Sequence, residues 1–140
     1  MLIPKKLKWG SKVRLIAPSQ SYAIVKPEQR EIAKKRFEEE LGLVISFGRH
    51  VEEIDQFNSS SIESRLEDLH DAFSDTEVDG VISIEGGFNS NQLLNWIDWE
   101  LIKNNPKVYC GYSDATVLNN AILAKTGMVS YSGPMFSTFG

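Results

Sequence analysis

Five short apolar runs alternate with helix-like segments along this chain of 140 residues. Each run is rich in β-branched or aromatic residues and is bounded by turn residues, as buried strands are. Strands that alternate with helices usually form a parallel sheet. We therefore expect one doubly wound α/β domain, flavodoxin-like or Rossmann-like, with a mostly parallel sheet and helices on both faces. The expected strands are Lys12–Ser19, Leu43–Gly48, Asp79–Gly87, Lys107–Ser113 and Met128–Ser132.

The segment after the first run has a helix start, an apolar face and a stop. Pro27 suits a first helical residue. Ala33, Phe37 and Leu41 then recur at four-residue intervals, and Gly42 follows them. This spacing predicts an amphipathic helix that ends at the glycine.

The clearest helix signal follows the second run. Ser60 and Glu63 form an S-x-x-E pattern, which predicts a capping box. Two weaker helical segments are expected at Asn91–Ile97 and Asp114–Lys125, the second ended by Gly127. In the capped helix, the inward face is predicted to carry Ile62, Leu66, Leu69 and Phe73, and the solvent face Glu63, Glu67, Asp68 and Asp71.

Composition excludes several classes of protein. The net charge is −4, and no basic cluster resembles a nucleic-acid footprint. A single cysteine allows no intrachain disulfide, and two histidines at unrelated spacings exclude the common metal motifs. We see neither a signal peptide nor a membrane-spanning run. We expect a cytoplasmic protein without metal or other cofactor, and without membrane or nucleic-acid partners.

Functional residues are expected in the loops beyond the carboxyl ends of the strands. Ser113 lies in such a loop, with Gly111 two residues before it and Ala115 two after. This is a G-x-S-x-A version of the nucleophile elbow, in which a strained turn exposes the serine hydroxyl. The amide of Asp114 would then face a developing oxyanion. The same pattern fits a strand-end glycine and a serine N-cap equally well.

Paired glycines in the neighbouring loop favour the elbow. Gly86 and Gly87 end the third run, and backbone amides without side chains can approach a ligand closely. A phosphate-binding loop is the rival interpretation, but the pair lacks both the G-x-G-x-x-G spacing and the Walker lysine. We therefore expect a second oxyanion donor there, facing Ser113.

Three motifs, EGGFNSNQLL, VYCGYSDAT and VSYSGPM, occur here in an order and spacing that are specific in combination. With the opening GSKVRLIAPS, they resemble the N-terminal domain of the LD-carboxypeptidase and microcin C immunity serine peptidases over essentially the whole chain. The resemblance implies a Ser-Glu-His hydrolase with Ser113 as nucleophile and the amides of Gly87 and Asp114 as oxyanion hole. Substrate contacts are expected from Gly86, Phe88, Asn89, Tyr112 and Ser132.

The implied substrate is an LD-peptide such as murein tetrapeptide, or a peptidyl or aminoacyl nucleotide of the microcin C type. The LD-carboxypeptidase branch often reads Gly-Gly-Tyr-Gly at the glycine loop and His-Gly-Pro at the fifth-strand loop, where this chain has Phe88–Asn91 and Ser132–Pro134. The chain therefore looks closer to the microcin C immunity branch. Family members take their Glu and His from a C-terminal domain, and a homodimer would fit the resemblance. Residues 1–140 would then be the nucleophile-bearing N-terminal domain, inactive alone.

The alternative is a non-catalytic ligand-binding or assembly module of the same fold. Among residues that could supply a base, His70 is expected on a solvated helix surface, whereas a site-facing position stays open for His50. Cys110 is expected to be a small buried thiol. We also expect a truncation at Gly140 that leaves an apolar surface beside Ser113, made of Phe88, Tyr112, Met135, Phe136 and Phe139.

Overall fold

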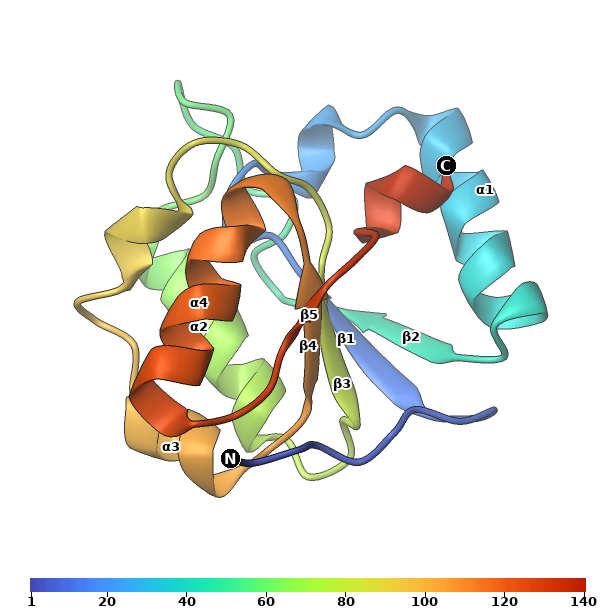
Figure 1. The fold of residues 1–140 in the computed structure, drawn as a ribbon. Helices are drawn as coiled ribbons and strands as arrows, with labels where there is room; N and C mark the ends of the chain where they lie inside the picture. Colours follow the sequence, from blue (N-terminus) through green and yellow to red (C-terminus); the bar gives the residue numbers. More distant parts are fainter.

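The computed structural model describes residues 1–140 and contains one sheet of five parallel strands in the order β2-β1-β3-β4-β5. From β1 the chain first adds β2 on one side and then builds β3, β4 and β5 on the other (Figure 1). This is the flavodoxin-like order, with its switch point between β1 and β3. The strands are β1 (Lys12–Ile16), β2 (Val44–Phe47), β3 (Gly80–Ser83), β4 (Val108–Gly111) and β5 (Tyr131–Ser132).

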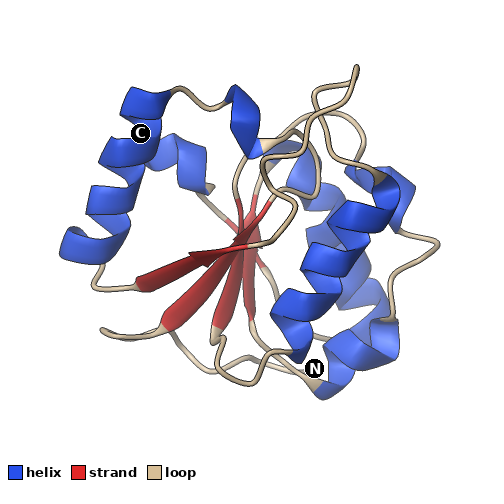
Figure 2. Cartoon of the chain, turned by 180° about the vertical axis from the view of Figure 1, so that it is seen from behind, coloured by secondary structure: helices blue, strands red, loops and turns tan.

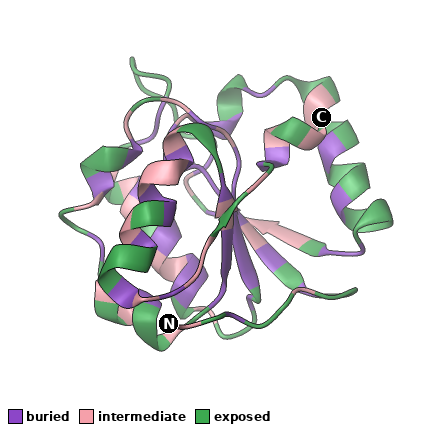
Figure 3. Ribbon diagram, in the orientation of Figure 1, coloured by how far each residue is buried: buried purple, intermediate pink, exposed green.

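Helices cover both faces of the sheet, as the alternating pattern predicts (Figures 1 and 2). One face carries α2 (Ile62–Ser74), α3 (Trp99–Asn104) and α4 (Thr116–Thr126). The other carries α1 (Pro27–Lys35) and the short C-terminal turn η5 (Phe136–Phe139). Each face has its own apolar core, and β3 is buried along its whole length (Figure 3). The fold expectation is confirmed.

Most of the predicted helix ends are confirmed. Pro27 is the first residue of α1, and the helix continues as one π-helical turn, η2 (Arg36–Glu40), before Gly42 in a left-handed conformation. Gly127 ends α4 in the same way, with φ of 72°. A left-handed residue after a helix is the usual role of glycine.

Two predictions about α2 are wrong. The N-cap is Ser61, whose Oγ accepts the amide of Ser64, and not Ser60. Ser60 is buried instead, and its backbone carbonyl accepts a hydrogen bond from Arg65. Asp68, expected on the solvent face, is 3% exposed, because the loop after β2 lies against it at Gly48, and its carboxylate there accepts a hydrogen bond from the His50 amide.

The region between β3 and β4 also differs from the expectation. In place of a helix over Asn91–Ile97, the chain forms a short 3-10 turn, η3 (Ser90–Leu93), and α3 begins only at Trp99. Asp98 caps α3 by accepting the amide of Leu101 at 2.9 Å. Leu93, Ile97 and Ile102 are buried, so this region packs apolar side chains on the core although its helix begins later than predicted.

Met135 and Phe136 are buried, which contradicts the expected exposed surface. After β5 the chain crosses toward α1 (Figure 1), and the Phe136 ring packs 5.3 Å from the ring of Phe37 and 5.8 Å from that of Tyr22. The apolar C-terminal residues Met135 and Phe136 are therefore covered by this domain itself. Of the expected surface, Phe88 and Tyr112 are exposed.

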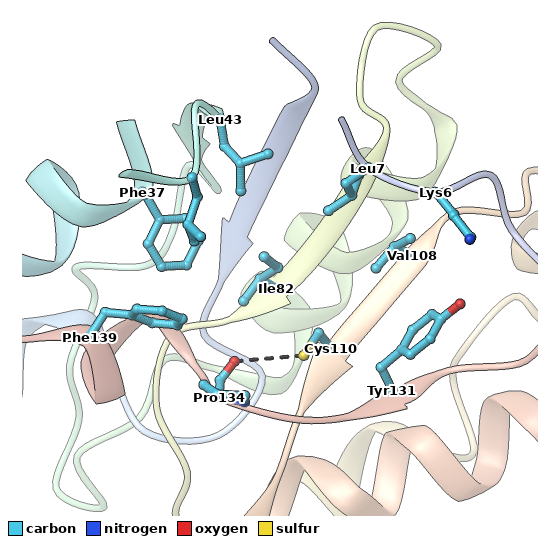
Figure 4. A pocket seen from close by; sticks show the side chains of 11 residues that line it. Lys6, Leu7, Phe37, Leu43, Ile82, Val108, Cys110, Tyr131, Pro134 and Phe139 are labelled. Atoms are coloured by element: carbon cyan, nitrogen blue, oxygen red, sulfur yellow. Dashed lines mark hydrogen bonds between the residues drawn. The ribbon is translucent and has the colours of Figure 1, made fainter. Parts of the chain in front are cut away.

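An apolar cavity of about 530 Å³ lies on the α1 side of the sheet (Figure 4). Phe37 and Phe139 line one side of it, and Ile82 and Cys110 lie on the strands. Cys110 is half-buried, and its Sγ donates to the carbonyl of Pro134 at 3.6 Å. Burial raises the pKa of this thiol, so it stays protonated near neutral pH.

Candidate active site

Ser113 adopts the strained conformation that the elbow requires. It follows β4 after the single residue Tyr112, opens the 3-10 turn η4 (Ser113–Ala115), and has a φ of 55°. Its side chain is exposed and makes no hydrogen bond, so it does not cap the following helix. The backbone prediction is confirmed, and the N-cap alternative is wrong.

Small neighbours make room for this turn, as expected. A Cβ atom at Gly111 would lie 2.8 Å from the Cβ of Ala115. The glycine loop after β3 passes directly beside the hydroxyl, since a Cβ at Gly86 would lie 3.2 Å from Ser113 Oγ. The structure therefore brings together the two loops that the sequence singled out.

The amides of Gly87 and Asp114 are available as donors. Neither N–H group donates to another atom of the chain. Gly87 has a φ of 150°, and a Cβ there would lie 2.2 Å from Ser19 Oγ, so only glycine fits. Two free amides beside an exposed serine hydroxyl are the components of an oxyanion hole.

The side chain of Asp114 has a role that the sequence did not indicate. Its Oδ2 accepts hydrogen bonds from Ser19 Oγ at 2.6 Å and from the Ser90 amide at 2.9 Å. Ser90 Oγ also donates to the carbonyl of Asp114 at 2.8 Å. The aspartate thus ties the loops after β1 and β3 to the elbow. Ser19 and Ser90 could have been noted as small polar residues in site loops.

The expected substrate-contact residues differ in how free their side chains are. Phe88 is 89% exposed, and Tyr112 and Ser132 are also exposed beside the elbow. The side-chain amide of Asn89 makes two hydrogen bonds within the chain. Its Nδ2 donates to Ser59 Oγ at 2.8 Å, and its Oδ1 accepts from Ser19 Oγ at 3.3 Å. A cavity of about 180 Å³ lies next to this loop, lined by Gln20, Phe57, Phe88, Asn89 and Gln92, none of them charged.

Neither histidine is placed to activate Ser113. Both ring nitrogens of His50 are bound by carboxylates, Glu53 at 2.6 Å and Glu67 at 2.8 Å. The hydrogen bond with Glu53 is the main cause that raises the pKa of His50. His70 is half-buried rather than solvated, and its Nε2 accepts the amide of Asp98, while burial lowers its pKa.

Arg65 is a further residue of the site region that the sequence analysis missed. It is 3% exposed and extends from the first turns of α2 toward the loops after β1 and β3, where it donates to the carbonyls of Pro18 and Asn89, each at 3.1 Å. A signal was present, because Arg65 lies on the same helical face as Ile62 and Leu69. A cation on an apolar helix face usually has specific partners.

The structure holds no cluster of His, Cys, Asp or Glu side chains that could bind a metal ion. None of its helices has both the length and the apolar character needed to cross a bilayer.

Comparison with known proteins agrees with this geometry. Residues 13–133 match the family model described as the LD-carboxypeptidase N-terminal domain. YocD of Bacillus subtilis, whose name assigns it to the carboxypeptidases, is 51% identical over 96% of this chain and 41% of its own length. The microcin C7 self-immunity protein MccF of Escherichia coli is 32% identical over 87% of this chain and 36% of its own length.

A solved structure agrees equally well. The crystal structure of an MccF-like protein from Bacillus anthracis superposes with a TM-score of 0.97 at 54% identity, covering 99% of this chain and 42% of that one. The chain thus spans less than half the length of the relatives that it matches. It belongs to the LD-carboxypeptidase family and corresponds to the N-terminal domain of that family.

Proposed function

We propose that Ser113 is the nucleophile of a serine peptidase and that the amides of Gly87 and Asp114 stabilise the oxyanion. The observation that carries this proposal is the left-handed backbone of an exposed serine beside two unpaired amides. In this mechanism Ser113 Oγ attacks the substrate carbonyl and its proton passes to a general base. The carbonyl oxygen gains negative charge and accepts hydrogen bonds from the two N–H groups.

The general base is proposed to be a His, and the carboxylate that orients it a Glu, both supplied by a C-terminal domain. No side chain of this chain hydrogen-bonds Ser113 Oγ, and both histidines are engaged elsewhere. The domain division, with residues 1–140 carrying the nucleophile, is supported by the length of the relatives. We also propose that the protein forms a homodimer and is located in the cytoplasm.

The proposed substrate is a small peptide or peptide-like molecule, either an LD-peptide or a peptidyl or aminoacyl nucleotide. The family name supports the first class, and the likeness to MccF and the MccF-like structure supports the second. The uncharged cavity with Phe57 and Phe88 at its rim would suit a flat, hydrogen-bonding group better than a charged one.

A fluorophosphonate probe tests the nucleophile. The chain is joined to the C-terminal domain of YocD, treated with the probe, and analysed by peptide mass spectrometry. We expect the label on Ser113 and its loss in Ser113→Ala, whereas Ser74→Ala, at an exposed serine that ends α2 and lies outside the site, keeps it. Labelling at another serine, or none, would contradict the proposal.

A non-catalytic ligand-binding module is the second candidate, favoured by the lack of any base in contact with Ser113. The two candidates differ in what Ser113→Ala does. A binding module would keep its affinity for an aminoacyl sulfamoyl adenosine in this variant and would show no hydrolysis in either form. An enzyme would lose turnover and keep most of the binding.

A further inference from the structure

The Arg65 side chain donates hydrogen bonds to five acceptors, three of which lie outside the start of its own helix. Its Nε donates to the carbonyls of Ser60 and Ser61 at 3.0 and 3.3 Å. Its Nη1 donates to Pro18 and Asn89, and its Nη2 donates to Gln92 Oε1 at 2.7 Å. Every acceptor is neutral, and no carboxylate contacts the guanidinium. One buried cation therefore joins α2 to the loops that follow β1 and β3.

The two loops held by Arg65 are the loops that adjoin the candidate oxyanion hole. Pro18 precedes Ser19, whose hydroxyl donates to Asp114 Oδ2 at 2.6 Å. Asn89 comes two residues after Gly87, and its neighbour Ser90 donates its amide to the same Oδ2 at 2.9 Å. The guanidinium thus holds the residue before Ser19, which contacts Asp114, and the loop residue Asn89, two positions after Gly87.

The chemistry of arginine suits this task. Its planar fork presents five N–H donors in fixed directions, so one side chain can bridge carbonyls from separate segments. Burial lowers the pKa of Arg65, and the charges of Asp55 and Asp114 oppose that shift. An arginine keeps its proton in proteins, so a positive charge stays beneath these loops. A lysine would supply the charge but could not reach all the acceptors at once.

We propose that Arg65 is a positioning residue, which fixes the glycine loop against the elbow so that the amides of Gly87 and Asp114 face the same point beside Ser113. The inference rests on the proposed function for its catalytic meaning. Its structural content, the coupling of two loops to the elbow through one guanidinium, is measurable without activity.

Amide hydrogen exchange tests the coupling in Arg65→Lys. The Ser90 amide reports on contact between the glycine loop and Asp114, and we expect its exchange to rise about tenfold, with a shifted Gly87 amide resonance. Arg30→Lys is the matched control, because Arg30 also donates to two carbonyls, those of Tyr22 and Val25, on the other face of the sheet. Its Ser90 and Gly87 signals should match the wild type.

A milder variant covers the case in which Arg65→Lys does not fold. Gln92 is exposed, and Gln92→Met removes only the acceptor of Nη2. We expect its Ser90 exchange to rise about threefold. A folded Arg65→Lys, or failing that Gln92→Met, with wild-type Ser90 exchange and Gly87 resonance would overturn the proposal and leave Arg65 as a core residue only.

Probe labelling then separates this inference from the proposed function. In the chain joined to the YocD domain, Arg65→Lys should slow fluorophosphonate labelling of Ser113 about tenfold at a temperature where the variant stays folded. Arg30→Lys should label at the wild-type rate. If no variant labels, the proposed nucleophile fails while the exchange data still decide the role of Arg65. Equal labelling of Arg65→Lys and wild type would contradict alignment of the amides.

Discussion

The backbone of Ser113 is held in a conformation that no contact of its own side chain stabilises. A non-glycine residue in the left-handed region costs on the order of 1–3 kcal/mol. Asn58 shares this region with a φ of 60°, but asparagine tolerates it well. The G-x-S-x-A pattern could place Ser113 at the junction but could not by itself separate the elbow from an N-cap, because both have a glycine before the serine. The paired glycines of the neighbouring loop favour the elbow, and the backbone angle decides between the two.

Relief of this strain can be measured. Ser113→Gly should raise the free energy of unfolding by about 1 kcal/mol, because the gain from removing the strain exceeds the extra backbone entropy that glycine loses. Ser113→Ala keeps the strain and should change stability little. Asn58→Gly serves as the control and should give a smaller gain. Urea unfolding of the three variants measures these differences, and a loss of stability in Ser113→Gly would show that the angle is not strained.

At the scale of the element, the sequence pattern of α2 predicts its apolar face but not its buried charged residues. The apolar spacing predicted the inward face of the helix correctly, and Leu69 and Phe73 are buried. Arg65 and Asp68 are buried on the same helix because of partners in loops that are distant in sequence. Such partners depend on the assembled fold, so the helix period alone could not reveal them. Likewise, three consecutive serines left the cap uncertain by one residue.

The N-cap of α2 can be tested by two neighbouring substitutions. Ser61→Ala removes the acceptor for the Ser64 amide and should lower the free energy of unfolding by about 1 kcal/mol. Ser60→Ala should cost less, since the contact of Ser60 with Arg65 uses its backbone carbonyl. Thermal unfolding of both variants measures the order of the two effects. The reverse order would place the cap at Ser60.

Two histidines on or beside α2 should give opposite pH dependences. The folded pKa of His50 is raised above 6.5, so its stabilising effect is complete below that pH and is lost as the pH rises through the folded pKa. The folded pKa of His70 is lowered, so its effect is present above 6.5 and is lost as the pH falls through that value and below. The wild-type advantage over His50→Gln should therefore shrink between about pH 6 and pH 8.

The advantage over His70→Gln should instead grow from about pH 5 to pH 7, because the Asp98 amide requires an unprotonated Nε2. Urea unfolding at several pH values measures both differences. Parallel profiles for the two variants would contradict the assigned hydrogen bonds.

At the scale of the whole molecule, the alternation of elements fits both flavodoxin-like and Rossmann-like strand orders, and only the structure selects the first. The parallel sheet with helices on both faces could be predicted from that alternation, because parallel connections leave few choices. The burial of the C-terminal residues could not be, because it depends on where the chain goes after β5. Phe136 fills a site between Tyr22, Phe37 and Phe47, with a ring distance of 5.9 Å to Phe47. Its role is therefore structural, whereas Phe88 remains free for contact with a ligand.

The two phenylalanines should respond differently to truncation. Phe136→Ala removes a fully buried ring and should cost about 3–5 kcal/mol. Phe88→Ala should change stability by less than about 0.5 kcal/mol, because its side chain lies almost wholly in solvent. Denaturant unfolding checks the first value. A cost near zero for Phe136→Ala would mean that the C-terminal turn is not part of the core in solution.

The chain by itself should hydrolyse neither LD-peptides nor aminoacyl sulfamoyl nucleotides at a useful rate. It presents a strained serine and two amide donors, but no side chain contacts Ser113 Oγ to take its proton, and a neutral hydroxyl is a weak nucleophile. In serine peptidases, binding and the oxyanion hole alone leave on the order of 10³-fold acceleration over water, which would be hard to detect.

Joining the YocD C-terminal domain should restore turnover, and Ser113→Ala should abolish it. Mass spectrometry of the released product measures both. Robust turnover by the 140-residue chain, lost in Ser113→Ala, would mean that a base lies within this domain, and a rearranged His50 would be the first residue to replace.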